Sequence, residues 1–346
     1  MNLKINFSGM ITNNPTYHGW PTVALTADGT LLAACSGNRE NHVCPYGRVF
    51  LYRSTNGGRN WTGPEFLSQG PLDDRDAGLC IAADGSILVN YFTSLCALYA
   101  RWEHDPAWDM IKRSITLDLL EKEHGYWMRR STDGGISWSE KYRTPVNNPH
   151  GPVRLKSGRL FMPGKDLDPA TATEARLAPG MSATVSDDNG VTWQHLSTIP
   201  APAGHDSAKC YELHATEAAD GTILVQIRDQ NGPSPVTWQT ESADGGLTWS
   251  EPHSICEGHP THLLTLKDGR ILMTYGWRKA PCGVRAMISN DNGRSWGEEL
   301  IIRTDAFNRD VGYPSTVEMP DGTFFTLWYE NDGTVAHLNY SNWELV

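Results

Sequence analysis

A short turn motif recurs five times along the chain, and a recurring motif restricts the fold to a repeat architecture. The motif is Ser-x-Asp/Asn-x-Gly-x-x-Trp, and its copies begin at Ser54, Ser131, Ser186, Ser242 and Ser289. The Asp or Asn side chain can accept hydrogen bonds from nearby backbone N–H groups, the glycine supplies a positive φ, and the tryptophan can fold back as an apolar plug. The motif therefore predicts a structural turn on repeated units rather than an active site.

A second repeat lies between these turns. Six alternating apolar runs are each broken by a turn with Asp-Gly or Ser-Gly at its centre, which is a strong hairpin signal. The turn glycines are Gly29, Gly85, Gly158, Gly221, Gly269 and Gly322. In the first five units a third strand, the turn motif and a fourth strand follow the hairpin. Four antiparallel strands repeated radially form a propeller, so we predict an all-β, six-bladed β-propeller in one domain over residues 1–346.

Two intervals depart from the repeat. The sixth unit lacks a good turn motif, and we expect the N-terminal segment "LKINFSG" to supply its outer strand. In blade 2 the interval before the turn motif is longer by about twenty residues, and the excess, about residues 97–125, is helical from Asp109 onward. Its apolar positions, roughly on one face, are Ile111, Ile115, Leu117 and Leu120. We predict one short helical insertion, and favour a surface feature or subunit contact over a lid.

Composition restricts the partners. The net charge of -11 argues against nucleic acid and anionic membrane surfaces, which normally require a basic patch. It leaves a small molecule or a saccharide, and a homo-oligomer is compatible with the sequence. The seven cysteines form neither a CxxC pair nor an even framework, and the first residues lack a signal-peptide pattern. We therefore expect a cytoplasmic protein with reduced thiols, while a processed secreted form stays open; no cofactor is predicted.

The hairpins also predict where a site would lie. Residues equally far before and after a hairpin turn are neighbours at one end of the sheet. Nine positions before the turn glycines stand Trp20, Asp76, Pro149, Glu212, Pro260 and Tyr313. Seven to ten positions after them stand Arg39, Lys165, Arg228, Arg278 and Glu330. Strand ends are often polar for no functional reason, but charged groups from several units converging on one mouth favour a binding site.

Several of these segments resemble one known family. The turn motifs, known as Asp boxes, the six hairpins and the segments "YELHATEAADGTILVQIRD", "YGWR" and "GYPSTVEMPDGTFFTLWYE" are similar to the sialidase (neuraminidase) superfamily over nearly the whole chain. Asp boxes alone indicate a fold and not an activity. The resemblance implies a glycoside hydrolase that releases a terminal acidic sugar. It also implies that Tyr313 is the nucleophile, Glu212 its partner, Arg228 and Arg278 carboxylate ligands, and Glu330 the residue that orients an arginine.

The chemistry of this set can be stated from the residue types. A sugar with a carboxylate at its reacting carbon repels an anionic nucleophile, whereas a phenol approaches as a neutral group, and sialidases are the known tyrosine exception among glycosidases. Tyr313 would attack, Glu212 would accept its proton, and Arg228 and Arg278 would hold the substrate carboxylate. We also expect the nearby arginines to lower the pKa of Tyr313.

The first part of the chain departs from the family pattern. Sialidases usually carry Arg-Ile-Pro in the first inner strand, whereas this chain has "HGWP", with Trp20 before Pro21. Trp20 is one of several tryptophans that could stack on a sugar ring, although core packing is the commoner role of such residues. Arg39, in "SGNRE", matches a further arginine of the family, so the chain retains one of the two arginines expected here.

The acid that should protonate the leaving group is also uncertain from the pattern, because His42 falls near the position of the expected Asp. One interpretation takes the acid from "DDRDAG", with Asp73, Asp74 or Asp76 beside the substrate-binding candidate Arg75. The second makes His42 the acid and base, since its ordinary pKa is close to neutrality. The third leaves His42 as a loop residue without a role.

Two other functions fit the same residues. One is a related propeller glycosidase or uronate-polysaccharide lyase that uses His42 and Tyr313, and the other is a propeller that binds glycans without catalysis. Four histidines could suggest a metal site, namely His150, His214, His259 and His262. A spacing of three places the last two on opposite faces of a strand, and we predict no metal.

Overall fold

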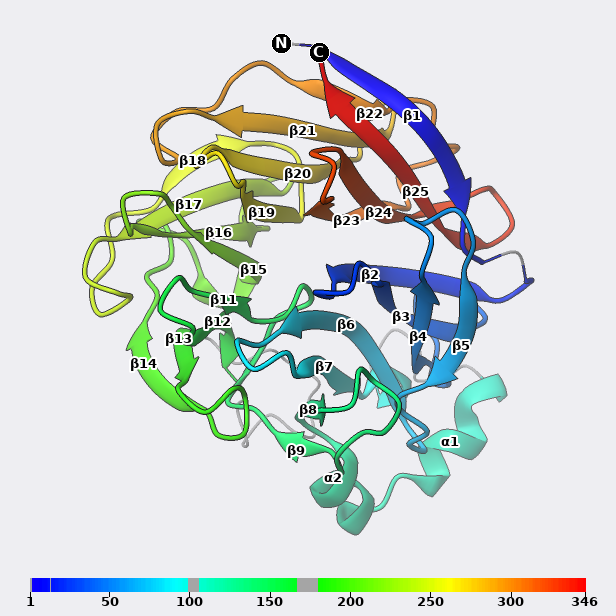
Figure 1. The fold of residues 1–346 in the computed structure, drawn as a ribbon. Helices are drawn as coiled ribbons and strands as arrows, with labels where there is room; N and C mark the ends of the chain where they lie inside the picture. Colours follow the sequence, from blue (N-terminus) through cyan, green and yellow to red (C-terminus); the bar gives the residue numbers. More distant parts are fainter. Residues whose placement is uncertain (1, 13, 99–105, 167–179) are drawn as a thin grey trace.

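The computed structural model describes residues 2–12, 14–98, 106–166 and 180–346, which form six antiparallel sheets around a central axis (Figure 1). Each sheet is one blade, and its strands run in order from the axis to the rim. Blade 1 contains β2 (Tyr17–Leu25), β3 (Leu31–Arg39), β4 (Arg48–Ser54) and β5 (Thr62–Phe66). Blade 2 contains β6 (Asp73–Ile81), β7 (Ile87–Ser94), β8 (Tyr126–Ser131) and β9 (Tyr142–Arg143). Blade 3 has a divided inner strand, β10 (Val146–Asn147) and β11 (Val153–Arg154), and then β12 (Leu160–Asp166), β13 (Met181–Ser186) and β14 (Gln194–Thr198).

The other three blades complete the ring. Blade 4 contains β15 (Cys210–Glu217), β16 (Ile223–Asp229), β17 (Val236–Ser242) and β18 (His253–Cys256). Blade 5 contains β19 (Thr261–Thr265), β20 (Ile271–Trp277), β21 (Gly283–Ser289) and β22 (Leu300–Arg303). Blade 6 contains β23 (Val311–Glu318), β24 (Phe324–Asn331), β25 (Ala336–Leu345) and β1 (Leu3–Met10). The predicted all-β, six-bladed propeller is confirmed.

The N-terminal strand closes the ring. β1 pairs antiparallel with β25, from Leu3 opposite Leu345 to Met10 opposite Asn339, and the two termini lie together at the rim (Figure 1). In blades 1 to 5 the turn motif connects the third strand to the fourth. In blade 6 that connection would join the C-terminus to the N-terminus, which explains why the sixth unit has no such motif.

The inner hairpins repeat one geometry. In every blade the last paired residues lie six positions apart, as for Ile81 and Ile87. The six turn glycines adopt φ between 82° and 92°, a region that other residues enter only at a cost. Identical turns place corresponding residues of the six inner strands at the same depth of the central channel.

The Ser-x-Asp/Asn-x-Gly-x-x-Trp turns join neighbouring blades. In the turn at Ser242, the serine hydroxyl donates to Asp244 at 2.8 Å and accepts the Gly246 N–H at 2.8 Å. Trp249, at the end of this turn in blade 4, donates to Ser197 of blade 3 at 2.9 Å, and its ring lies 6.1 Å from that of Phe161. The turn is therefore structural, as its sequence predicted, and it lies at the rim.

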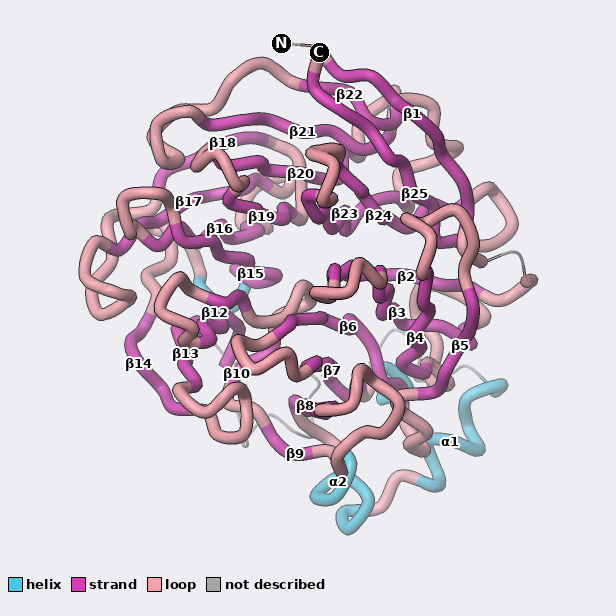
Figure 2. Tube along the Cα trace, viewed as in Figure 1, coloured by secondary structure: helices cyan, strands magenta, loops and turns pink. Residues whose placement is uncertain are grey.

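In the described residues, helix is confined to short segments (Figure 2). The blade 2 insertion contains η1 (Cys96–Leu98), η3 (Pro106–Trp108), α1 (Asp109–Ser114) and α2 (Leu117–Glu123), and η5 (Ser207–Lys209) precedes β15. The predicted helical insertion is present, and its described residues form two short α-helices because Thr116 is extended and caps α2 by accepting the Leu119 N–H at 3.2 Å. Within the described ranges, no helix is long and apolar enough to span a membrane.

The insertion packs against a loop of blade 1. Trp108 and Ile111 are buried together with Cys96, and Val43 and Tyr46 lie against this cluster. Val43 and Tyr46 belong to the β3–β4 loop that also carries His42. The insertion therefore supports the His42 loop from outside.

Candidate functional site

Four inner strands share an uncommon backbone conformation at one depth of the channel. Trp20, Asp76, Glu212 and Tyr313 each stand nine positions before a turn glycine and adopt φ between 51° and 58°. The strand pairing changes register at each of them, so each lies in a β-bulge. Among the described residues, the other non-glycine residues with positive φ are all asparagines, which tolerate it. Strained positions of this kind cluster at functional sites, and here they mark the mouth of the channel.

Glu212 connects Tyr313 with Arg228. The Tyr313 hydroxyl donates a short hydrogen bond to Glu212 Oε1, and Arg228 Nη1 lies 2.5 Å from Glu212 Oε2. All three side chains are largely buried. The phenolic proton therefore already points at a carboxylate, which is the arrangement needed to activate a tyrosine nucleophile.

The two carboxyl groups of the mouth have pKa values displaced in opposite directions. Burial alone would raise the pKa of Glu212, but the charge of Arg228 and the hydrogen bonds from Tyr313 and Arg228 outweigh it, and the pKa is lowered. Burial raises the pKa of Asp76 to about 6, against the charge of Arg75 and with the help of the charge of Glu212. Near neutral pH, Glu212 is thus a proton acceptor and Asp76 exchanges protons readily.

The pKa of Tyr313 differs from the expectation. Burial, followed by the charges of Glu212 and Asp76, raises it well above its ordinary value, and the opposing arginines Arg228 and Arg278 are weaker. The arginines do lower the pKa of Tyr313, as predicted, but burial and the two carboxylates raise it by more, so the expected net direction is wrong. The resting phenol is therefore neutral, and any reaction through its oxygen would require loss of the proton, for which Glu212 is the hydrogen-bonded acceptor.

Arg278 presents a positive charge to the mouth. Its Nε donates to the Val311 carbonyl at 3.0 Å and its Nη2 to the Tyr329 hydroxyl at 3.3 Å, and both partners are uncharged. No acidic side chain in the described part of the chain forms a salt bridge with Arg278. Its charge is thus not neutralised by a direct ion pair.

The arginines of the mouth also line a cationic pocket of ≈ 340 Å³. Its charged residues are Arg228, Arg278, Lys279, Arg309 and Glu257. Lys279 pairs with Glu257 at 2.5 Å and Arg228 with Glu212 at 2.5 Å, so Arg278 and Arg309 carry the remaining positive charge of the pocket. A local excess of positive charge on a protein of net charge -11 favours an anionic ligand.

A second polar cluster surrounds Asp310, just before β23. Its carboxylate accepts from Tyr17 at 3.0 Å, His42 Nδ1 at 3.0 Å, Tyr329 at 3.0 Å and Asn331 at 3.2 Å. Burial would raise the pKa of Asp310, but the hydrogen bond and charge of His42, with those other hydrogen bonds, lower it to about 2. The His42 ring lies 5.0 Å from the Trp20 ring, so this cluster adjoins the four bulges.

Trp20 lies beneath the surface of the mouth. The Arg75 guanidinium lies 4.0 Å from the centre of the Trp20 ring and that of Arg39 4.9 Å, and Trp20 is 1% exposed. Arg75 also lies 3.4 Å from Asp76. The assignment of Trp20 as a sugar-stacking residue is therefore corrected, because its ring supports Arg75 instead.

Arg39 lies behind the mouth. Its side chain is fully buried in an ion pair with Asp73, and it donates to the backbone carbonyls of His42 at 3.1 Å and Cys44 at 3.4 Å. Arg39 thus holds the His42 loop and has no exposed surface for a substrate. Asp73 forms this ion pair, and Asp74 accepts a hydrogen bond from the Thr93 hydroxyl at 2.7 Å. Asp76 is therefore the acidic residue of "DDRDAG" that lies at the mouth.

Glu330 also lies outside the mouth. It binds Arg303 of the outer strand β22 through hydrogen bonds of 3.1 and 2.9 Å. It therefore orients an arginine, but the predicted convergence with Tyr313 is wrong. Side chains alternate across a strand, and the neighbouring Tyr329 takes the face toward the mouth.

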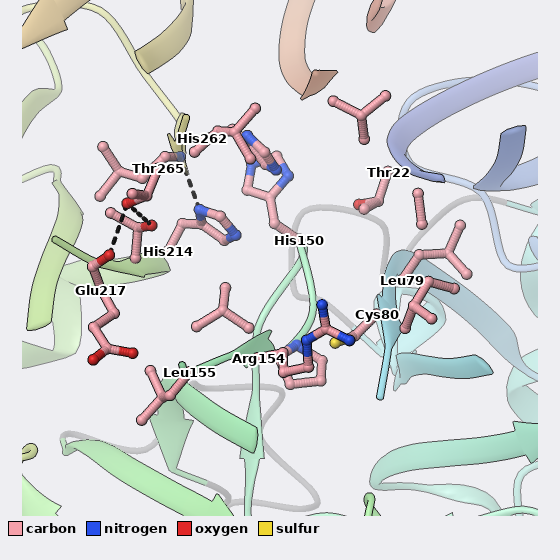
Figure 3. Close-up of a pocket in the computed structure, with 18 of the residues that line it drawn as sticks. Thr22, Leu79, Cys80, His150, Arg154, Leu155, His214, Glu217, His262 and Thr265 are labelled. Atoms are coloured by element: carbon pink, nitrogen blue, oxygen red, sulfur yellow. Dashed lines mark hydrogen bonds between the residues drawn. The ribbon is translucent and has the colours of Figure 1, made fainter. Parts of the chain in front are cut away.

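Three of the four candidate histidines meet deeper in the channel, at a pocket of ≈ 690 Å³ toward the hairpin ends (Figure 3). The rings of His214 and His262 stack at 4.3 Å, and His150 lies 5.3 and 5.4 Å from them. His214 Nδ1 accepts the Leu263 N–H at 2.9 Å. Burial lowers the pKa of all three, that of His150 to about 3. Within the described residues, no group of three or more His, Cys, Asp or Glu is arranged to hold a metal, and His259 lies apart, in the cationic pocket.

Comparison with known proteins agrees with this architecture. Residues 49–326 match the BNR repeat-like domain. The chain belongs to the BNR repeat-like domain family. A sialidase of Bacteroides fragilis (strain YCH46) is 26% identical over 92% of this chain and 60% of its own length, so this family member spans less than two thirds of that relative.

Solved structures of similar fold extend the comparison. A protein of unknown function from Dyadobacter fermentans DSM 18053 has a TM-score of 0.81 and 23% identity, with both chains fully covered. The Hadza microbial sialidase Hz136 has a TM-score of 0.68 and 17% identity over 94% of this chain and 65% of that one. The predicted resemblance to the sialidase superfamily is confirmed at the level of the fold and of related sequences.

Four residues of the candidate site were not predicted from the sequence: Tyr17, Asp310, Tyr329 and Arg309. The signals were present but weak, since Asp310 precedes Tyr313 by three residues and Tyr329 precedes Glu330 by one. A count from the turn glycine cannot choose between neighbours on a strand, because one residue changes the face.

Proposed function

We propose that this BNR repeat-like protein is a sialidase-type exo-glycoside hydrolase that releases a terminal acidic sugar, sialic acid or a related sugar, from the end of a glycan. The observation that carries the proposal is the hydrogen-bonded Tyr313–Glu212 pair with Arg228 bound to the same carboxylate. Tyr313 and Glu212 are largely buried in strained bulges at the mouth of the channel, and strained positions of this kind cluster at functional sites.

The geometry supports the following roles. Tyr313 attacks the anomeric carbon as Glu212 takes its proton, which yields a covalent glycosyl–tyrosine intermediate that water then hydrolyses. Arg228 and Arg278 bind the sugar carboxylate, and Arg75 adds a cation above Trp20. Since Trp20 stands where sialidases usually have an arginine, we expect slow turnover of ordinary sialosides and faster turnover of another acidic sugar.

The test begins with aryl glycosides of sialic and uronic acids. Tyr313→Phe removes only the phenolic oxygen and is expected to lower kcat by about 10²-fold or more without loss of folding. Glu212→Gln should lower kcat comparably, and the double variant should be hardly worse than either single variant, because the two groups act as one unit. Tyr340→Phe, in the outer part of blade 6, is the matched control and should retain full activity.

A trapping experiment separates this mechanism from the alternatives. A fluorinated analogue of the preferred sugar, which slows hydrolysis of the intermediate, should leave a covalent adduct on the peptide that contains Tyr313, detected by mass spectrometry. Near-normal activity of Tyr313→Phe would refute the proposal. Release of an unsaturated sugar would instead identify a lyase, and glycan binding without turnover a lectin-like propeller.

A further inference from the structure

We propose that His42, positioned by Asp310, is the general acid and base that acts on the leaving group. This inference rests on the glycosidase function proposed above and names two residues that complete its site. It is carried by the geometry around Asp310, where four side chains converge on one carboxylate and one of them is an imidazole at the mouth.

The hydrogen bonds define the orientation of the His42 ring. Asp310 is held ionised, so it can only accept, and both His42 Nδ1–H and the Tyr17 hydroxyl must donate to it. The Tyr17 oxygen also lies 2.9 Å from His42 Nδ1. This leaves Nε2 as the nitrogen available to a substrate. A carboxylate that fixes the tautomer of a histidine and stabilises its protonated form is a recurring arrangement in acid–base catalysis.

The position of His42 suits a group that acts on the leaving glycan. In an exo-glycosidase the terminal sugar enters the mouth and the leaving group extends toward solvent, so the acid must lie at an exposed level. The His42 side chain is 45% exposed, whereas that of Asp76 is 9% exposed and lies at the same depth as Tyr313 and Glu212. Asp76 is therefore placed to contact the bound sugar, and His42 to reach the departing oxygen.

The proton balance closes over the two steps. In the first, the Tyr313 oxygen bonds to the anomeric carbon, Glu212 takes the phenolic proton, the glycosidic C–O bond breaks, and protonated His42 gives its Nε2 proton to the leaving oxygen. In the second, neutral His42 takes a proton from water, the water oxygen bonds to the anomeric carbon, and the Tyr313 oxygen leaves and recovers its proton from Glu212. The sum is hydrolysis, with no other reactant.

The acid is also connected to the anion site. Tyr329 donates to Asp310 at 3.0 Å and accepts from Arg278 at 3.3 Å, so the arginine proposed to bind the substrate carboxylate and the carboxylate that holds His42 share one hydroxyl. The charged groups facing His42 come from several blades. Burial is the largest influence on the pKa of His42 and, with the charges of Arg75 and Arg278, it lowers that pKa on balance, against the hydrogen bond and charge of Asp310. Tyr17 is in hydrogen-bond contact with the same ring.

Leaving-group dependence tests the assignment. An aryl glycoside with an acidic phenol needs little protonation, whereas an alkyl glycoside of the same sugar needs an acid. His42→Ala should therefore reduce kcat/KM by about 10²–10⁴-fold for the alkyl glycoside and far less for the aryl glycoside. Asp310→Asn should show the same selectivity at smaller size, and Asp76→Asn should impair both substrates alike. The proposal would be overturned if Asp76→Asn impaired the alkyl glycoside more than the aryl glycoside while His42→Ala impaired both alike.

An NMR titration tests the positioning role without any substrate. In ¹³C,¹⁵N-histidine-labelled protein the His42 signal is assigned by its loss in His42→Gln. The apparent pKa of His42 should fall by about half a unit or more in Asp310→Asn, because the ionised partner is gone. Asp332→Asn, which removes a carboxylate beside His337 instead, should leave His42 unchanged.

The two readouts distinguish the inference from the proposed function. An unchanged His42 pKa in Asp310→Asn overturns the dyad whatever the activity. If the wild-type protein hydrolyses no acidic glycoside while the His42 pKa responds to Asp310→Asn, the proposed function fails and the catalytic role of His42 fails with it, but the positioning by Asp310 stands.

Discussion

At the scale of residues, β-bulges decide which side chains reach the mouth. A bulge adds one residue to an inner strand and turns its side chain toward the axis. The bulges bring Asp76, Glu212 and Tyr313 together at the mouth. In the fourth bulged strand, Arg75 covers the ring of Trp20. The arginines reach the same space from the ends of the second strands. A substitution at the mouth should therefore change chemistry or affinity more than stability.

Arg278→Lys tests the anion site at this scale. An ammonium group cannot reproduce the planar fork that binds a carboxylate, so KM for the acidic sugar should rise by about 10-fold or more with a smaller change in kcat. The measurement is steady-state kinetics at two salt concentrations. Arg294→Lys is the control, since Arg294 lies in a rim turn, 70% exposed, and pairs with Asp220. Equal effects of the two variants would contradict the assignment.

At the scale of elements, the rim turns hold the blades together and take no part in the site. Each positions a tryptophan against the core of the preceding blade, as Trp249 packs on Phe161 and Trp61 lies 5.9 Å from Phe325. The blade 2 insertion instead contacts the loop that carries His42. We therefore expect a substitution in a rim turn to change stability and not activity, and one in the insertion to change activity more than stability.

Ser242→Ala should lower stability but not activity. The variant leaves the buried Gly246 N–H without its acceptor, which should cost about 1–3 kcal/mol of unfolding free energy. Urea unfolding measures the cost, and kcat and KM should stay at wild-type values because the turn is at the rim. A change in KM without a change in stability would show that the turn contributes to the site.

Ile111→Ser should have the reverse effect. A hydroxyl in the cluster of Trp108 and Cys96 weakens the support of residues 40–47, so backbone hydrogen exchange there should accelerate and kcat should fall. The thermal midpoint should move little, because the cluster lies outside the six blades. Leu117→Ser, 78% exposed in the same insertion, is the control. Unaltered exchange over 40–47 in Ile111→Ser would refute the supporting role.

At the scale of the whole molecule, closure of the ring creates a central channel that buries several histidine side chains. The pairing of β1 with β25 joins the two ends of the chain in blade 6 and covers the outer side of β25. The channel buries the stacked rings of His214 and His262 with His150 edge-on to both, and among the described residues His150 has no hydrogen-bond partner at either ring nitrogen. Such groups remain neutral in the folded protein and become protonated on unfolding at acidic pH.

Stability is therefore expected to fall on mild acidification. Burial lowers the pKa of His150 and His259 to about 3 and of His18 to about 4, with His214 and His262 lower than usual as well. Above the ordinary histidine pKa of ~6.5 both states are neutral; below it only the unfolded chain takes up protons, and each group costs about 1.4 kcal/mol per pH unit until the folded-state pKa is reached. Burial raises the pKa of Asp74 and Asp76 to about 6, so these two carboxyl groups gain protons in the folded protein first and oppose the loss of stability, but they are fewer than the histidines.

Urea unfolding between pH 7.5 and pH 5 checks this expectation. His150→Leu, which removes one of the buried imidazoles, should reduce the loss of stability over this interval. The exposed His195→Leu is the matched control and should leave the dependence unchanged. A wild-type stability that does not fall between these values would contradict the neutral state of the histidines.

The amino-acid sequence by itself determined the turns, the hairpins, the number of blades and the closing strand, because each depends on contacts between residues near in sequence or on a repeated pattern. Counting from the turn glycines placed Tyr313, Glu212, Arg228 and Arg278 at the mouth among other residues, and the resemblance to the sialidases singled out these four. The tertiary structure alone decided which charged groups face the mouth. Arg39 and Glu330 face away from the mouth because they pair with Asp73 and Arg303 of neighbouring blades. Asp310 contacts His42 although the two are 268 positions apart. Contacts of this kind between blades depend on packing and not on residues near in sequence.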